Sequence, residues 1–126
     1  MSYKKTREKL IEIAKEELAL ANDNNPQFRS WHEAVAVLYE EAEEARDELN
    51  EMMSWARLFW AETKKDDPHP ETLRKLRRHA ISTAAEAIQT AAMAAKALQY
   101  GKAQEELAQT ETAARPREED AENDNA

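Results

Sequence analysis

Residues 38–60 read LYEEAEEARDELNEMMSWARLFW, and this stretch decides the fold. Its apolar side chains recur at alternating spacings of four and three residues, the period of a helix that packs along one side. Trp55 and Trp60 broaden this row toward its end. We therefore expect one long helix with a continuous apolar row, which consists of Leu38, Ala42, Ala45, Leu49, Met52, Ala56 and Phe59.

Capping and breaking residues on both sides of this stretch predict the ends of the helices. Ser30 is a favourable N-cap, and Glu33 follows at the spacing of a capping box. The string DDPHP at 66–70 contains two prolines, which block continuation of the helix. Before the long helix, a first helix is expected over Tyr3–Ala21, followed by a turn at NDNNP, residues 22–26.

A third helix is predicted to begin near Pro70, a favourable residue in a first helical turn. Its row of small residues lets two helix backbones approach closely, so we expect it at the centre of the bundle or at a subunit interface. Past Gly101 the pattern fades, and we expect one helical domain over 1–108 and a disordered acidic tail over 109–126. The row consists of Leu73, Ala80, Ala84, Ala87, Ala91, Ala94 and Leu98.

Composition narrows the function classes. The chain has 126 residues, which favours one all-α domain, a bundle of three main helices. It has no cysteine, which excludes zinc–thiolate sites and thiol nucleophiles, and its one glycine excludes a glycine-rich phosphate loop. The net charge of −8 argues against a nucleic-acid binder. Neither a secretory signal nor a membrane-spanning run is expected, so we predict a cytoplasmic protein.

Three carboxylates stand out because of their positions on the predicted helices. Glu41 and Glu44 lie one helical turn apart, beside the apolar row. Glu86 is the only acid between Thr72 and Gln104. Carboxylates that converge between two helices repel one another unless a proton or a cation neutralises them, and clustered oxygens suit Mg²⁺ or Mn²⁺. We expect these three side chains to face inward, whereas Glu43, Asp47 and Glu48 are expected to be exposed or peripheral.

A solvated acidic face is the alternative interpretation of the same pattern, because acid-rich helix surfaces are common without a metal. A ferritin-like diiron centre is disfavoured, since no Glu-x-x-His pair occurs in the chain.

Two motifs, in this order, give a family resemblance. HEAVAVLYEEAEEARDEL at 32–49 and EAIQTAAMAAKAL at 86–98 resemble the MazG-like nucleoside triphosphate pyrophosphohydrolases, especially small stand-alone phage and bacterial members. That all-α family carries EExxE on one helix and ExxD on a later one. Here Glu40, Glu41 and Glu44 match the first motif. Glu86 matches the second, in which Gln89 stands at the position of the aspartate.

The resemblance implies Mg²⁺-dependent hydrolysis of a nucleoside triphosphate to the monophosphate and pyrophosphate, with Mn²⁺ as a possible substitute. Glu41, Glu44 and Glu86 would hold the metal with Gln89 as a weak fourth ligand, and Glu40 would be a further ligand or the general base. It also implies a homo-oligomer, a dimer or a tetramer. The basic residues beside the predicted turn would bind the phosphates; they are Lys64, Lys65, Arg74, Arg77 and Arg78.

Two other functions fit the sequence. One is a catalytically weakened relative that serves as a helical nucleotide-binding or protein-interaction module, because Gln89 offers a cation only a neutral oxygen. The other is a coiled-coil adaptor, which explains the apolar rows but not the isolated Glu86.

Overall fold

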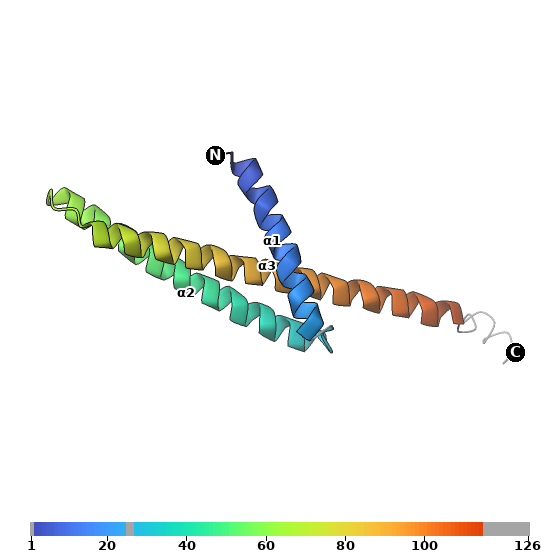
Figure 1. Cartoon of the computed structure of the whole chain (residues 1–126). Coiled ribbons are helices and arrows are strands. Elements are labelled where there is room, and N and C mark those ends of the chain that lie inside the picture. Colours follow the sequence, from blue (N-terminus) through green and yellow to red (C-terminus); the bar gives the residue numbers. More distant parts are fainter. Residues whose placement is uncertain (1, 25–26, 115–126) are drawn as a thin grey trace, which may run out of the picture.

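The chain folds into three α-helices in the computed structural model, which describes residues 2–24 and 27–114. They are α1 (Tyr3–Asn24), α2 (Trp31–Lys64) and α3 (Pro70–Ala114). Helices α2 and α3 run side by side as a long antiparallel hairpin, and α1 crosses α3 and projects from it (Figure 1). The described residues contain no strand, so the predicted all-α class with three helices is confirmed. None of these helices has an apolar segment long enough to cross a bilayer.

The ends of α2 and the start of α3 follow the sequence signals. The Ser30 hydroxyl oxygen accepts a hydrogen bond of 3.1 Å from the backbone N–H of Glu33, as an N-cap does. Asp66 takes a positive φ of 58° in the turn that follows Lys64. Pro70 then begins α3.

Two helices are longer than predicted. Helix α1 continues past Ala21 to Asn24, and the Asn22 side chain donates to Gln99 on α3, which anchors this last turn. Helix α3 continues through Gly101 to Ala114, past the boundary predicted at residue 108. Strong helix formers such as Gln104, Glu105 and Leu107 favour that extension. The rest of the predicted tail, 115–126, lies outside the described residues.

The alanine row of α3, which was expected at the centre of the bundle or at a subunit interface, is not the side of the helix that packs on α2. A row of half-buried or buried residues, among them His79, Glu86 and Met93, faces α2. Most of the predicted alanine row is exposed instead, including Ala84, Ala87 and Ala91. On α2 the predicted row is only partly covered: Leu38, Ala45, Met52, Ala56 and Phe59 are half-buried, whereas Ala42 and Leu49 are exposed.

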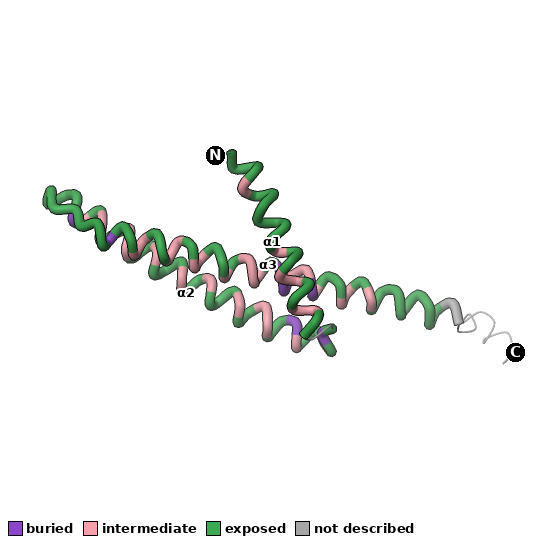
Figure 2. Tube along the Cα trace, in the orientation of Figure 1, coloured by how far each residue is buried: buried purple, intermediate pink, exposed green. Residues whose placement is uncertain are grey.

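The core of a single chain is small. Its buried apolar residues are Phe28, Ala34, Ala92 and Met93, at the place where α1 crosses the hairpin. None of the described large side chains is fully buried. Most of the length of the hairpin is exposed or half-buried (Figure 2).

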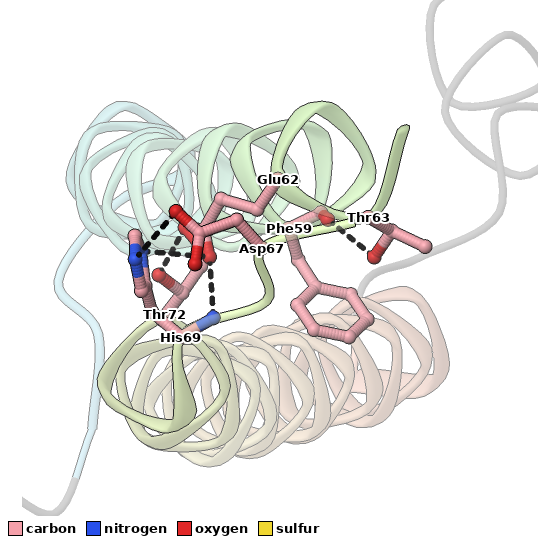
Figure 3. Close-up of polar contacts among 6 residues, drawn as sticks. All are labelled: Phe59, Glu62, Thr63, Asp67, His69 and Thr72. Atoms are coloured by element: carbon pink, nitrogen blue, oxygen red, sulfur yellow. Dashed lines mark hydrogen bonds and ion pairs between the residues drawn. The ribbon is translucent and has the colours of Figure 1, made fainter. Parts of the chain in front are cut away.

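Glu62 fixes the turn between α2 and α3 (Figure 3). Its carboxylate accepts hydrogen bonds from the Thr72 hydroxyl and from the backbone N–H of His69, the latter at 2.8 Å. The His69 ring also lies 3.2 Å from the same carboxylate. The Thr72 hydrogen bond, followed by the contacts from His69, lowers the pKa of Glu62. The turn therefore holds the far end of the hairpin through one ionised side chain.

Candidate metal centre

Three carboxylates meet between α2 and α3. Glu41 and Glu44 lie on successive turns of α2, and Glu86 lies opposite them on α3. One carboxylate oxygen of each residue lies within 4.8 Å of those of the other two. The structure thus brings together the three residues that the sequence singled out, and we call them the carboxylate cluster. Glu41 and Glu86 are half-buried, whereas Glu44 is exposed rather than turned inward.

The carboxylates of the cluster disfavour one another's ionisation. Burial, and then the negative charges of Glu44, Glu86 and Glu40, raise the pKa of Glu41. Partial desolvation, a hydrogen bond shared with Glu86 and the charges of Glu86 and Asp47 raise the pKa of Glu44. Such a group of acids gains free energy when it binds a proton or a cation.

The donor set fits a hard divalent cation. Carboxylate oxygens are the ligands that Mg²⁺, Mn²⁺ and Ca²⁺ prefer. Two oxygens on opposite sides of an ion lie about 4.2 Å apart for Mg²⁺ and about 4.6–5.2 Å apart for Ca²⁺, twice the metal–oxygen distance. The three carboxylate oxygens of the cluster lie within 4.8 Å of one another, which is close to the spacing that one bound ion requires. The exposed side chain of Glu44 is free to adjust.

Gln89 and Glu40 lie outside the carboxylate cluster. The Gln89 amide nitrogen donates a hydrogen bond of 2.8 Å to Glu17 on α1, so the predicted weak fourth ligand is engaged with the first helix. Glu40 is exposed on α2 beside the cluster, and its charge contributes to the raised pKa of Glu41. Sequence reasoning missed Glu17, because no local signal indicates which residue of α1 meets Gln89.

The five predicted phosphate-binding residues lie toward the turn, and the structure does not bring them to the cluster of their own chain. At 1.5 Å per residue, Lys64 lies about 30 Å beyond Glu44 along α2, and Arg78 lies about 12 Å before Glu86 along α3. Arg74 instead pairs with Glu71 at 3.2 Å, and the Lys64 ammonium lies 5.6 Å from the Trp60 ring centre. Lys65 and Arg77 are exposed at the same end of the hairpin.

A second polar layer adjoins the cluster and was not predicted. His79 Nδ1 lies 2.8 Å from a carboxylate oxygen of Glu48, which corrects the expectation that Glu48 is exposed or peripheral. The Trp55 ring stacks on His79, with ring centres 6.5 Å apart. The signal for this layer was the heptad spacing, since Glu48 follows Glu41 by seven residues and His79 precedes Glu86 by seven.

Comparisons of the chain with protein-family models, with curated proteins and with solved structures gave no match. The resemblance of the two motifs to the MazG-like family stays a hypothesis.

Proposed function

We propose that the protein is a Mg²⁺-dependent nucleoside triphosphate pyrophosphohydrolase of the cytoplasm, which releases a nucleoside monophosphate and pyrophosphate. The observation that carries this proposal is the convergence of Glu41, Glu44 and Glu86 from two helices. These residues also occupy corresponding positions in the two motifs that resemble the MazG-like enzymes. A solvated acidic face does not require acids on opposite helices to meet.

The carboxylate cluster would hold the metal through one oxygen from each residue. A bound divalent cation supplies charge neutralisation for the triphosphate and activation of the attacking water. Glu40 lies next to Glu41 and is exposed, so its carboxylate is available to orient water and to accept its proton. Basic groups for the phosphates would come from outside the immediate cluster, because Lys64 and the other predicted residues lie toward the turn.

Two measurements test the proposal. Calorimetric titration of Mn²⁺ should show binding to the parent protein and to Glu43→Gln, a control that removes an exposed acid of the same helix. Glu86→Gln should lose that binding. A panel of nucleoside triphosphates with Mg²⁺ or Mn²⁺ should release pyrophosphate with the parent and not with Glu86→Gln. Equal binding by all three proteins, or none by the parent, would show that the cluster is a solvated face.

A catalytically weakened nucleotide-binding or interaction module is the second candidate. The hydrogen bond between Gln89 and Glu17 favours it, because an amide held against α1 adds no charge to the cluster. In that case the parent protein would bind Mn²⁺ and nucleotide without releasing pyrophosphate.

Self-association belongs to the proposed function, and we propose a homo-oligomer, a dimer or a tetramer. One chain alone buries little: large apolar residues such as Trp60, Ile81 and Leu98 remain exposed. Exposed apolar surface of this extent is typical of an interaction surface rather than of an isolated monomer.

A further inference from the structure

An open space of about 370 Å³ lies between α1 and α3, and we call it the α1–α3 space. One end is closed by the hydrogen bond from Gln89 to Glu17. From this closed end, the first half of α1 projects away from the hairpin (Figure 1). Leu10 and Ile13 form the wall on α1. The wall on α3 consists of Ile81, Ala84, Ala85 and Ile88.

Helices α1 and α3 run in the same direction where they cross. Glu17 contacts Gln89, and Asn22, five residues later on α1, contacts Gln99, ten residues later on α3. The residues that precede Glu17 therefore lie toward the residues that precede Gln89, at the turn end of the hairpin. The mouth of the space is thus formed by the first turns of α1 and the early turns of α3.

Three arginines continue the wall of α3 toward this mouth. Each stands seven residues before a residue of the wall, and seven residues make two helical turns, so each arginine lies on the side that faces the space. All three are exposed. Among the described residues, only Arg74 has an ion pair, with Glu71 at 3.2 Å. In sequence order, Arg74 precedes Ile81, Arg77 precedes Ala84, and Arg78 precedes Ala85.

Two cations of α1 lie on the other side of the mouth. Arg7 is one turn before Leu10 and Lys9 is one turn before Ile13, so both lie beside the wall of α1. Both are exposed, and neither has an ion pair within the described part of the chain. Glu8 stands between them in the sequence, but it is two residues from Leu10 and therefore on the opposite side of the helix.

The walls of the space favour its closure, whereas the cations at its mouth oppose closure. Ile81 is 68% exposed and Ile13 is 43% exposed, so movement of α1 toward α3 would remove apolar surface from water. The same movement would bring Arg7 and Lys9 closer to the three arginines, and like charges repel. An anion with several charges at the mouth would turn this repulsion into attraction on both sides.

We propose that the mouth of the α1–α3 space binds a polyphosphate anion and that α1 closes onto α3 around it. Arg7 and Lys9 hold the anion from α1, and the three arginines hold it from α3, through charge-assisted hydrogen bonds. The closed end of the space adjoins the carboxylate cluster, because Gln89 is three residues from Glu86. The choice of a polyphosphate as the ligand rests on the proposed function, whereas the site and the movement of α1 do not.

Calorimetric titration of inorganic tripolyphosphate into the metal-free protein tests the site. Two double variants remove the same charge from α1. Arg7→Gln with Lys9→Gln removes the cations at the mouth and should weaken binding about tenfold. Lys4→Gln with Lys15→Gln removes two exposed cations opposite Ile13 and should bind as the parent does. Equal weakening by both double variants would show attraction by net charge alone and overturn the site, as would a parent that does not bind.

Spin labels on two introduced cysteines test the movement, because the parent chain has no cysteine. Glu8→Cys on α1 and Ser54→Cys on α2, toward the turn, place the labels at exposed positions outside the space. Labelled chains are diluted with unlabelled protein, so that the distances measured are within one chain. Tripolyphosphate should shorten the distance between the labels, and should not do so when Arg7→Gln and Lys9→Gln are also present. Binding without a change in this distance would overturn the closure of α1.

The same probe separates this site from the proposed catalysis. Without metal, Glu86→Gln should bind tripolyphosphate as the parent does, because the mouth does not include the carboxylate cluster. Closure of α1 in a protein that releases no pyrophosphate from nucleoside triphosphates would overturn only the enzyme. Pyrophosphate release by a protein that does not bind tripolyphosphate would overturn only the polyphosphate site. Equal affinity for inorganic phosphate, or higher affinity for a single-stranded oligonucleotide, would overturn the choice of a polyphosphate as the ligand.

Discussion

His79 Nδ1 on α3 lies 2.8 Å from a carboxylate oxygen of Glu48 on α2, so polar contacts hold the middle of the hairpin. The side chains are 22% and 32% exposed, and the pair is therefore only partly shielded from water. The pair lies two helical turns along the hairpin from Glu41 and Glu86, which belong to the carboxylate cluster. The interior of the hairpin thus contains two neighbouring polar layers, of which the carboxylate cluster consists of acids alone.

Removal of the Glu48 carboxylate should weaken the hairpin without affecting the cluster. Glu48→Ala leaves His79 without its acceptor, and we expect the free energy of unfolding to fall by about 1 kcal/mol. Glu43→Ala removes an exposed acid of the same helix and should change the free energy of unfolding by less than about 0.5 kcal/mol. Urea denaturation measures both values, and Mn²⁺ titration should give the same affinity for both variants. Equal stabilities would show that the Glu48–His79 hydrogen bond contributes nothing.

The metal-free protein should become more stable as the pH is lowered from 7 toward about 5. Glu41 and Glu44 have a raised pKa in the folded state, so their ionisation above the ordinary glutamate pKa of 4.5 opposes folding. Glu62 affects stability in the opposite direction. Because its pKa is lowered in the folded state, its ionised form stabilises the fold above pH 4.5, and this stabilisation is lost as the pH falls further. Urea denaturation at both pH values should show the gain in the parent and a smaller gain in Glu41→Gln. Saturating Mg²⁺ should also reduce this gain in stability. A parent protein that is no more stable at pH 5 than at pH 7 would contradict the prediction.

The turn between α2 and α3 should depend on the hydroxyl of Thr72. This residue is 5% exposed, and its hydroxyl donates to the Glu62 carboxylate. Thr72→Val keeps the side-chain shape but withdraws one donor from that carboxylate, and we expect a loss of about 1–3 kcal/mol in the free energy of unfolding. Thr63→Val is the control, because the exposed Thr63 hydroxyl bonds only to Phe59 of its own helix. The prediction fails if the two variants are equally stable.

The ends of the helices were predictable from local chemistry, whereas the place of the alanine row of α3 was not. Ser30 caps α2 through its own hydroxyl, and Pro70 begins α3 through its fixed φ, so both effects depend on the residue type alone. The small size of Ala84, Ala87 and Ala91 favoured the centre of the bundle or a subunit interface for this row, but alanine buries little area. The row with His79 and Glu86 faces α2 instead, where His79 shares a hydrogen bond with Glu48.

The carboxylate cluster was predictable because Glu41 and Glu44 are one turn apart and Glu86 is isolated among alanines. The place of Gln89 was not predictable. Its partner Glu17 comes from α1, and the angle at which α1 crosses α3 depends on contacts distant in sequence.

The contact between Gln89 and Glu17 gives the last prediction. Gln89→Asp replaces the amide donor with a second carboxylate beside Glu17, so α1 should detach more readily from α3 in the metal-free protein. Backbone amides of α1 should then exchange with solvent about tenfold faster, the factor that corresponds to about 1.4 kcal/mol. Glu17→Gln in the same chain removes the repulsion and should restore slow exchange. The added carboxylate should also tighten Mn²⁺ binding, most strongly in the double variant, where Glu17 no longer opposes it. Unchanged exchange in Gln89→Asp would show that this hydrogen bond does not hold α1 in place.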